Sequence, residues 1–375
     1  MRTIMILAID NAESQQLLDM DMSLSALEEA YKDLGTGAAI TSPRIDLLTP
    51  DSYVDEDGNT LPGAHSLKTM SASTQKYAAI RFLTDKLFWH ERGGNFRRDR
   101  TPGTQRAHSV TRGLLFLFSL ETGDLLALIS EGHIRNLRVG AAAGLAARYL
   151  AKPDASSVAV LGTGFMAGAH LDAMLNAVEG VKSVRVFSPN PEHRERFVED
   201  PRWERCPDVA AAGSAEEAVR GSEIVIIATN ALTPVIRTGW LEPGQYVCSV
   251  RHCEIAPETF GRFDVLAVNS RDNLGPTTFV AKNAHGPLPK QVLLDIEKGY
   301  PPGDAVEIDW AHTPDLPDLL LGRHPGRANA EQITCFNNSV GFGLQFAALA
   351  GKVYEAAVRQ GVGRQVPDDV FPDLF

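Results

Sequence analysis

A glycine-containing turn between an apolar run and a helix-like segment constrains the fold of this chain most. Gly162 and Gly164 follow the apolar run of residues 157–161, and Ala167 comes three residues later. In such a GxGxxA motif the first glycine permits a tight turn, the second lets the backbone approach a pyrophosphate, and the small third residue lets the helix pack on the sheet. The amino end of the helix adds free N–H groups for the phosphates. The motif therefore predicts a dinucleotide site at residues 162–167.

Strand-like runs alternate with helix-like segments around that turn, at about 25 to 30 residues per unit. The strand-like runs cover residues 157–162, 184–188 and 223–230, and the helix-like segments cover residues 167–178, 191–200 and 215–221. Such alternation is typical of βαβ units, which build a parallel sheet. We therefore expect an α/β fold with a Rossmann-type nucleotide domain.

The rest of the chain has a different pattern, and 375 residues are enough for two domains with separate cores. We predict helices over residues 23–34, 138–150 and 339–363, short strands within 78–83 and 113–129, and a long exposed loop over 91–104. The helix at 138–150 is rich in alanine and small residues, which is typical of a tightly packed helix. This part is expected to form an α+β domain.

Composition excludes several classes of protein. With 47 acidic and 36 basic residues the formal net charge is −11, so neither a nucleic-acid partner nor a polybasic membrane anchor is expected. The four cysteines include no CxxC pair, which favours a reducing compartment and excludes a disulfide scaffold. We see neither a signal peptide nor a membrane-spanning run, and we expect a cytoplasmic protein. Asp309, His312 and Asp315 lack a recognised metal-ligand spacing, so no metal is expected.

The end of the second strand-like run bears on the choice of cofactor. An NAD site usually presents an acidic residue there for the ribose 2′-hydroxyl. This chain has Ser188 and Asn190 instead, and Arg194 lies just beyond, where a guanidinium can pair with a 2′-phosphate. These residues are equally compatible with a solvated first helical turn. The pattern favours NADP over NAD and leaves NAD open.

Three cationic residues are candidates for binding a substrate carboxylate. Arg44 follows a proline-containing segment, and guanidinium groups match carboxylates bidentately. Lys76 precedes a strand, and a partly buried lysine has a lowered pKa and can exchange a proton. Arg138 begins the alanine-rich helix just before the nucleotide domain. Taken one at a time, each is also compatible with an ordinary surface cation.

Four segments, at residues 120–130, 134–174, 224–236 and 326–345, resemble in order the ornithine cyclodeaminase/μ-crystallin family. The resemblance runs from about residue 44 to residue 363 and implies a nucleotide domain, residues 151–322, inserted into a substrate-binding and dimerisation domain, residues 1–150 and 323–375. It also implies a homodimer. The family includes cyclodeaminases, alanine dehydrogenases, and ketimine or pyrroline-carboxylate reductases.

The resemblance also implies roles for individual residues. Arg44 matches the arginine of the family's PxR motif, and Lys76 matches its substrate lysine. Arg138 matches the arginine of an RTxA motif in which Val139 replaces threonine, and Ser339 matches the serine of a late SxG motif that reaches the cofactor. With the glycine motif and the end of the second strand, the expected cofactor-binding residues are Gly162, Thr163, Gly164, Phe165, Met166, Ser188, Asn190, Arg194, Thr229, Val250 and Ser339.

The chain departs from the family where cyclodeaminases carry a catalytic aspartate. Residues 249–260 lack that aspartate and hold Arg251, His252, Cys253 and Glu254 instead. An arginine and a histidine there would repel a cationic side chain such as that of ornithine. His252 is a candidate proton donor to an imine near neutral pH, and Glu254 is a candidate displaced substitute. Each of them is also compatible with a loop surface.

These features predict an NAD(P)-dependent oxidoreductase that acts on an amino acid or its imine. The substrate would be bound by Arg44, Lys76 and Arg138, and a proton would be handled by Lys76 or His252. Two alternatives stay open. One is a cyclodeaminase-type ammonia lyase that keeps NAD bound, and the other is an NADP-binding protein without turnover.

Overall fold

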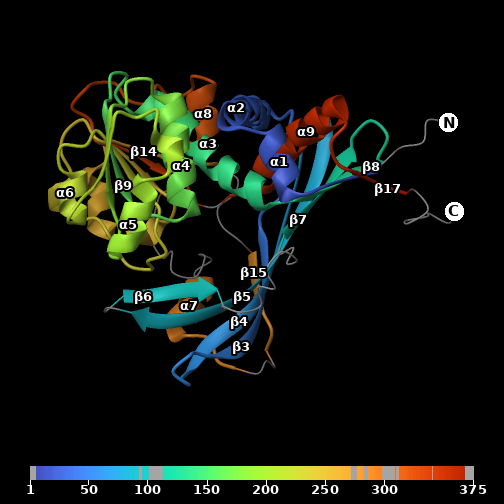
Figure 1. Cartoon of the computed structure of the whole chain (residues 1–375), viewed down its shortest axis with the longest axis horizontal. Helices are drawn as coiled ribbons and strands as arrows, with labels where there is room; N and C mark the ends of the chain where they lie inside the picture. Colours follow the sequence, from blue (N-terminus) through green and yellow to red (C-terminus); the bar gives the residue numbers. More distant parts are fainter. Residues whose placement is uncertain are drawn as a thin grey trace.

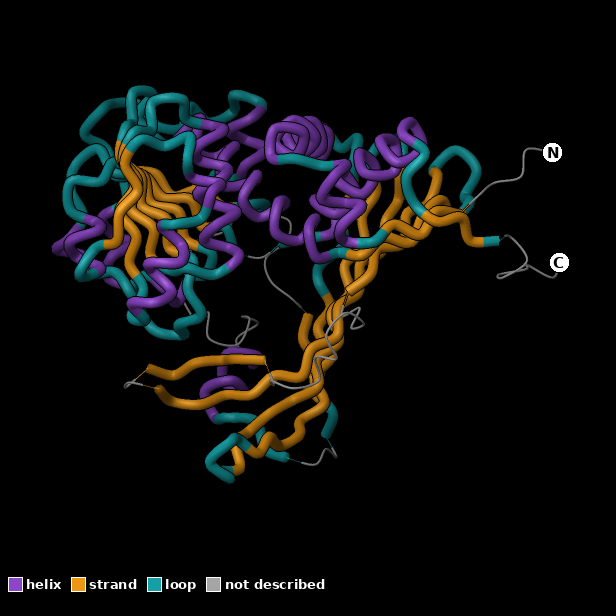
Figure 2. Tube along the Cα trace, in the orientation of Figure 1, coloured by secondary structure: helices purple, strands orange, loops and turns teal. Residues whose placement is uncertain are grey.

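The computed structural model describes residues 6–92, 95–100, 113–271, 277–282, 286–297, 309, 312–339 and 341–367. The strands of these residues form two sheets (Figures 1 and 2). One sheet, at the left of Figure 1, is enclosed by helices. The other is long and bent, and it runs from the upper right of the view to the bottom. The expected combination of a nucleotide-type sheet with a second α+β part is confirmed.

The seven-stranded sheet is wholly parallel, in the order β11-β10-β9-β12-β13-β16-β14. Its strands are β9 (Ser157–Leu161), β10 (Ser183–Phe187), β11 (Asp208–Ala211), β12 (Ile224–Ile227), β13 (Tyr246–Ser249), β14 (Val265–Val268) and β16 (Thr334–Asn337). They are short, nearly continuous apolar runs because helices cover both faces of the sheet. The strand order reverses at β9, the strand that precedes the glycine turn. In such sheets ligands bind beyond the carboxyl ends of the strands at that point.

Small residues let the two central helices of this part approach closely. Here α3 (Gly132–Leu150) packs along α4 (Phe165–Ala177). A side chain at Gly140 would collide with the carbonyl of Ala169, and one at Gly144 would press on Ala173. The tightly packed helix predicted at residues 138–150 is therefore confirmed, although it begins six residues earlier. The shorter helices are α5 (Pro191–Val198), α6 (Ala215–Val219) and the 3-10 turns η1 (Pro201–Trp203), η2 (Thr238–Trp240), η3 (His252–Glu254) and η4 (Pro257–Arg262).

The long sheet is mostly antiparallel, in the order β15-β3-β4-β5-β7-β8-β1-β17, with β2 paired to β4 and β6 paired to β5. Its strands are β1 (Ile6–Ile9), β2 (Ile40–Thr41), β3 (Ile45–Val54), β4 (Thr60–Ser73), β5 (Tyr77–Arg92), β6 (Asn95–Arg100), β7 (Gly113–Ser119), β8 (Leu125–Ser130), β15 (Thr277–Val280) and β17 (Arg364–Val366). β5 extends to Arg92 and β6 follows at Asn95, so much of the loop predicted over residues 91–104 is a hairpin.

Helices cover one face of the upper half of this sheet. α2 (Met20–Thr36) and α9 (Gly343–Gln360) pack on each other, and α9 lies on β4 and β5. α2 contains the helix predicted at residues 23–34, whereas α9 is shorter than the helix predicted at residues 339–363 and lies within that range. α1 (Asn11–Leu17) and α8 (Leu316–Leu320) lie beside them, and α7 (Lys290–Glu297) lies at the lower end of the sheet (Figure 1).

The two sheets exchange strands across the domain limits expected from the sequence. β15 falls within residues 151–322, yet it pairs with β3 of the long sheet. β16 falls within residues 323–375, yet it lies between β13 and β14 of the nucleotide-type sheet. Two strands, β15 and β16, therefore lie in the other part from the one that the expected domain limits assign them to. The chain passes between the two parts several times.

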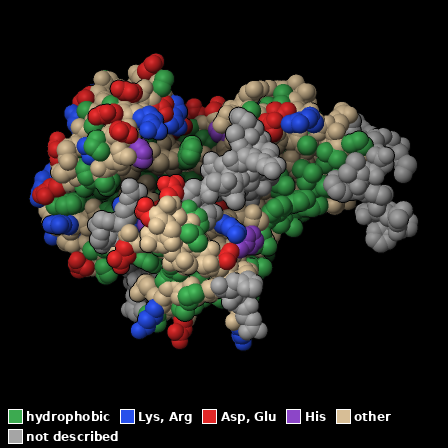
Figure 3. Space-filling view, turned by 60° about the horizontal axis from the view of Figure 1, so that its bottom comes forward, with side chains coloured by type: hydrophobic (Ala, Val, Ile, Leu, Met, Phe, Trp, Pro, Cys, Tyr) green, Lys and Arg blue, Asp and Glu red, His purple; other side chains and the backbone are tan. Residues whose placement is uncertain are grey.

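The outward face of the long sheet is apolar. Ile45, Leu47, Ile80 and Phe279 have exposed fractions of 41 to 56%, and the rings of Phe82 and Phe116 lie 5.7 Å apart on the same face. Figure 3 shows apolar side chains gathered over part of this sheet. Among the described residues no helix has both the length and the apolar character needed to cross a membrane.

Candidate functional site

The glycine turn has the geometry that the sequence predicts for a phosphate loop. Gly162 has φ +112°, and a side chain there would collide with the carbonyl of Ala228, so only glycine fits. Gly164 is the N-cap of α4 and lends no side chain to it, and a Cβ at this position would meet no atom within 4 Å. No side chain therefore caps the first N–H groups of α4, and there is open space beside Gly164. A diphosphate fits this turn.

The other expected cofactor residues lie at the same edge of the sheet. Ser188 directly follows β10, Thr229 follows β12, Val250 follows β13, and Ser339 follows β16. Because the strands are parallel, their carboxyl ends meet at one edge, which is the edge of the glycine turn. Thr163, Phe165 and Met166 belong to the turn itself, and Phe165 is 82% exposed. The structure thus brings this set of predicted residues together.

Asn190 and Arg194 have structural contacts at that edge. The Asn190 side chain accepts hydrogen bonds from the backbone N–H groups of Glu192 and His193 and so caps α5. Arg194 donates to the carbonyl of Ser188 over 2.6 Å, and its guanidinium lies 5.4 Å from the centre of the Phe187 ring. A cation is therefore held at the end of β10, where the adenosine ribose lies in nucleotide domains of this type.

Glu254 holds the two loops that follow β12 and β13. Its buried carboxylate accepts hydrogen bonds from the N–H and hydroxyl of Thr229 (2.6 and 2.7 Å), the hydroxyl of Ser249 (3.2 Å) and the N–H of Arg251 (3.1 Å). Burial raises the pKa of Glu254 to about 7. His252 begins the 3-10 turn η3, but its side chain lies outside the described residues. Both carboxylate oxygens of Glu254 therefore accept hydrogen bonds from residues in these two loops and at the end of β13.

A second group of polar residues lies on the inner face of the long sheet. Lys68 of β4 is half-buried and faces Asp46 of β3 across the ladder. Arg44 donates two hydrogen bonds of 2.9 Å to Asp46. Burial, and after it the charge of Arg98, lowers the pKa of Lys68 to about 7. Lys68 can therefore exchange a proton near neutral pH.

Arginines from β5, β6 and α3 extend this group. Arg81 and Arg135 pair with the buried Glu131 at 2.5 and 3.3 Å. Arg100 pairs with Asp85 at 3.0 Å. Together with the residues above and Arg138, they form what we call the cationic cluster. Its members are Arg44, Lys68, Arg81, Arg100, Arg135 and Arg138, with the carboxylates Asp46, Asp85 and Glu131.

Arg138 is the member of the cluster nearest to the nucleotide helix. It donates to Gln345 over 2.7 Å, and its guanidinium lies 5.0 Å from the centre of the Phe346 ring. Its Nε is buried and has no hydrogen-bond partner among the described residues. Burial, together with the charge of Arg81, lowers its pKa to about 9. The cluster holds more cations than carboxylates, and the charge of Arg98 also acts on it, so the cluster favours an anionic ligand.

The structure does not bring Lys76 to this cluster. Its side chain is 75% exposed, and its ammonium lies 3.6 Å from Glu355 of α9. Lys68 pairs with Leu83 of β5, and the strand between Leu83 and the turn at Lys76 spans roughly 20 Å. Lys68, which the structure places in the cluster, was not among the residues predicted from the sequence. Its signal is a single lysine in a row of alternate residues, from Ala64 to Ala72, that is otherwise small or apolar.

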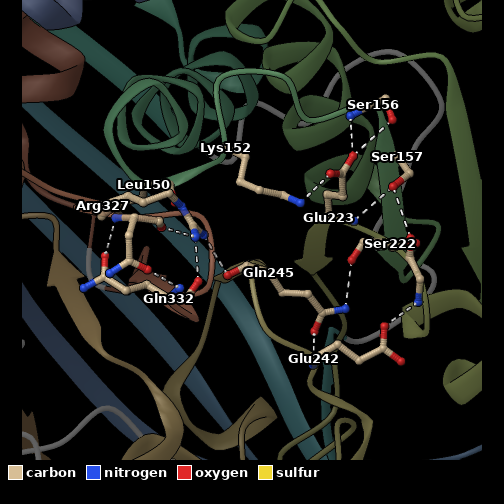
Figure 4. Close-up of polar contacts among 12 residues, drawn as sticks. Leu150, Lys152, Ser156, Ser157, Ser222, Glu223, Glu242, Gln245, Arg327 and Gln332 are labelled. Carbon is tan, nitrogen blue, oxygen red and sulfur yellow. Dashed lines mark hydrogen bonds and ion pairs between the residues drawn. The ribbon is translucent and has the colours of Figure 1, made fainter.

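A pocket of 420 Å³ lies at the opposite edge, beside the amino ends of β9, β12 and β13 (Figure 4). Its polar groups bind one another. Glu223 pairs with Lys152 at 2.7 Å and accepts hydrogen bonds from the N–H and hydroxyl of Ser156. Behind it Arg327 donates to several backbone carbonyls, including those of Leu150 and Gln245. We assign these contacts a structural role. Within the described ranges no cluster of three or more His, Cys, Asp or Glu side chains is placed to hold a metal ion.

Comparison with known proteins agrees with this geometry. Residues 94–260 match the model of the ornithine cyclodeaminase/mu-crystallin family. An alanine dehydrogenase of Archaeoglobus fulgidus is 25% identical over 366 residues, which cover 96% of this chain and 98% of the relative. The chain therefore resembles this family over its central part. A Δ1-pyrroline-2-carboxylate reductase of Bacillus cereus is 27% identical, over 70% of this chain and 76% of the relative.

Solved structures of family members share the whole fold. The Thermococcus litoralis Δ1-pyrroline-2-carboxylate reductase, in complex with NADH and L-proline, is 25% identical with a TM-score of 0.71, and the match covers 96% of this chain and 100% of that one. An archaeal alanine dehydrogenase dimer with bound NAD is 24% identical with a TM-score of 0.72, and the match covers 97% and 99%. The expected resemblance to this family and the expected fold class are confirmed.

Proposed function

We propose that this chain is an NAD(P)-dependent oxidoreductase that converts an amino acid to its imine or reduces the imine. The observation that carries this proposal is the pairing of two sites by one helix. α3 packs Gly140 against the nucleotide helix α4, and it holds Arg138, whose guanidinium would collide with a side chain at Gly341 in the loop after β16, at the cofactor edge. A nucleotide at the open glycine turn and an anion at Arg138 would therefore be neighbours.

The relatives support the same chemistry. They include an alanine dehydrogenase and Δ1-pyrroline-2-carboxylate reductases, and one solved relative holds NADH together with L-proline. An amino acid and its cyclic imine share a carboxylate next to the reacting carbon. The surplus positive charge of the cluster suits that group.

The nicotinamide, when bound, supplies or accepts the hydride. The chain's own residues bind and orient the substrate. Arg138 offers its buried Nε to the carboxylate, and Lys68 binds the same end of the molecule from β4. Arg44 fixes the carboxylate of Asp46 opposite Lys68. With a pKa of about 7, the Lys68 Nζ can give a proton to the imine nitrogen or take one from the amine.

In this proposal Lys68 replaces Lys76 as the substrate lysine. His252 keeps its predicted part as a second proton carrier. The cofactor-binding set stays as predicted, with Asn190 contributing through the cap of α5. We further propose that NADP is preferred to NAD, because a guanidinium rather than a carboxylate lies at the end of β10.

A homodimer is proposed from the outward face of the long sheet. Exposed Ile45, Leu47, Ile80 and Phe279 share a sheet face with Phe82, whose ring lies against that of Phe116, and contiguous apolar faces mark interaction surfaces. One solved relative is a dimer. None of the four cysteines, all of which are described, forms a disulfide, which supports a cytoplasmic location.

The test is a turnover assay at 340 nm with NADPH and with NADH. Pyrroline-2-carboxylate, piperideine-2-carboxylate, and pyruvate with ammonia are the substrates. We expect cofactor consumption with at least one of them. Ammonia release from ornithine without net change at 340 nm would instead identify a cyclodeaminase. Tight nucleotide binding without turnover on this panel would identify a binding protein.

A further inference from the structure

A continuous line of hydrogen bonds joins the cationic cluster to the nucleotide turn through the buried interior. It passes through side chains from α3, α9, α2, the loops after β14 and β16, and α4. We call it the relay, and its members in order are Arg138, Gln345, Tyr31, Asn269, Asn338 and His170. All except the half-buried Arg138 are buried, with exposed fractions of 4% or less.

The first half of the relay leads from the cluster into the core. Arg138 donates to the side-chain oxygen of Gln345 over 2.7 Å. The Gln345 amide donates to the hydroxyl of Tyr31 over 2.9 Å. Tyr31 in turn donates to the side-chain oxygen of Asn269 over 3.0 Å. Each group that receives a bond on one side thus gives one on the other.

The second half leads to the first turn of α4. The Asn269 amide donates to the side-chain oxygen of Asn338 over 2.8 Å, and the Asn338 amide lies 3.0 Å from Nε2 of His170. Nδ1 of His170 lies 2.7 Å from the carbonyl of Met166. The same Asn338 amide donates to the carbonyl of Val139, next to Arg138 in α3. Met166 belongs to the predicted nucleotide turn, so the relay ends at the cofactor site.

All six bonds point the same way. Nδ1 of His170 faces a carbonyl oxygen and must therefore carry the proton, which leaves Nε2 to accept from Asn338. Burial lowers the pKa of His170 to about 4, so the ring stays neutral. The line therefore starts at a cation and donates toward Met166 throughout. Hydrogen bonds in such a line polarise one another, and the effect is larger away from water.

We propose that the relay couples the two sites, with Gln345, Tyr31, Asn269 and Asn338 as positioning residues that touch neither ligand. The inference rests on the proposed function. The charge and orientation of Arg138 set the polarity of the line, and the line fixes the first turn of α4. An anion bound at Arg138 therefore changes the affinity of the nucleotide turn for the cofactor, and the cofactor changes the affinity for the anion equally.

The experiment is a double-mutant cycle read out as the Kd for NADPH, measured by its fluorescence. Arg138→Met removes the cation, and Tyr31→Phe breaks the relay by one hydroxyl. We expect Arg138→Met to change the Kd by about fivefold or more when Tyr31 is present, and by less than about twofold in the Tyr31→Phe background. Tyr246→Phe is the matched control, because its buried hydroxyl bonds to the carbonyl of Ala143 in α3, off the relay. In that background the effect of Arg138→Met should persist.

The outcomes separate the two proposals. If folded wild-type protein binds neither NADPH nor NADH, the proposed function is wrong. If it binds and Arg138→Met has the same effect with and without the Tyr31 hydroxyl, the relay does not couple the sites and this inference is overturned. Asn269→Asp breaks the relay at a second point, because it keeps the oxygen that accepts from Tyr31 and loses the amide that donates to Asn338. This variant replaces Tyr31→Phe in the cycle if Tyr31→Phe does not fold.

A second readout needs no ligand. In histidine-selective ¹⁵N spectra, His170 is identified by the signal that His170→Gln removes. We expect Arg138→Met to shift the His170 Nδ1 resonance in the presence of Tyr31 and not in the Tyr31→Phe background. A shift that is independent of Tyr31 would overturn the relay.

Discussion

Replacing Lys68 and Lys76 one at a time separates the two lysines that the sequence and the structure offer for the substrate carboxylate. Lys68→Met removes a half-buried ammonium opposite Asp46, whereas Lys76→Met removes one that is 75% exposed. Both substitutions keep an unbranched side chain and shorten it by one atom, the charged nitrogen. They therefore form a matched pair that differs in position alone.

The expected magnitude follows from the two contacts that Lys68 would make. A hydrogen bond from a charged donor is worth about 1.5–3 kcal/mol, and proton transfer to a reacting group contributes about 10²–10⁴-fold. The two effects multiply, so Lys68→Met should lower kcat/KM by about 10³–10⁶-fold. The ion pair of Lys76 with Glu355 at 3.6 Å is exposed, and such pairs contribute at most about 1 kcal/mol to stability. Lys76→Met should leave kcat/KM within about twofold.

The assignment of Lys68 also predicts how kcat/KM changes with pH in each direction of the reaction. Imine reduction needs protonated Lys68, whose pKa is about 7, so kcat/KM should be constant below that pH and fall above it. Amine oxidation needs the neutral form, so its kcat/KM should rise with pH and level off above 7. The Kd for NADPH, measured by fluorescence, should stay within about twofold in both variants. A larger kinetic loss in Lys76→Met than in Lys68→Met would refute the assignment.

Three further predictions concern the nucleotide turn, the cofactor choice and the dimer. Gly162→Ala places a Cβ against the carbonyl of Ala228, at a backbone φ of +112°. We expect the free energy of unfolding to fall by about 1–3 kcal/mol and NADPH binding to become unmeasurable. A Kd equal to that of the wild type would contradict the assignment of residues 162–167 as a phosphate loop. Arg194→Ala should raise the Kd for NADPH about tenfold and that for NADH less than twofold; equal changes would exclude a 2′-phosphate contact. Ile80→Asp, on the exposed apolar face, should convert a dimer to a monomer in light scattering, and an unchanged mass would place the interface elsewhere.

The nucleotide turn could be predicted because its determinants are local. The strand, the two glycines and the helix that follows lie within about one supersecondary unit, and Gly162 shows its constraint in the sequence itself. The edge at which Ser188, Thr229 and Val250 meet also follows, since parallel strands place their carboxyl ends together.

The long sheet could not be predicted in the same way. Residues 60–73 contain Pro62, Gly63 and several serines, and β6 is rich in arginine, so local preferences favour loops. Their strand structure depends on pairing with β5 and on contacts from distant segments, such as the bond from Leu232 to the carbonyl of Phe96. β15 and β16 likewise find partners far away in the chain.

The choice between the two lysines shows the same limit. Lys68 and Lys76 are eight residues apart, and an even separation places both on the same face of an extended chain. Neither alternation nor charge distinguishes them. The β4–β5 hairpin decides, because it turns between the two lysines and leaves Lys76 at the exposed end.

The surplus positive charge of the cationic cluster has a practical consequence at the bench. Unbalanced ions withdrawn from water are costly to a fold, so the protein without substrate should take up small anions from its buffer. Sulfate and phosphate would then raise the melting temperature, inhibit competitively against the organic acid and, through the relay, shift the Kd for the nucleotide. Rates measured in different buffer salts will not be comparable until the anion is held constant.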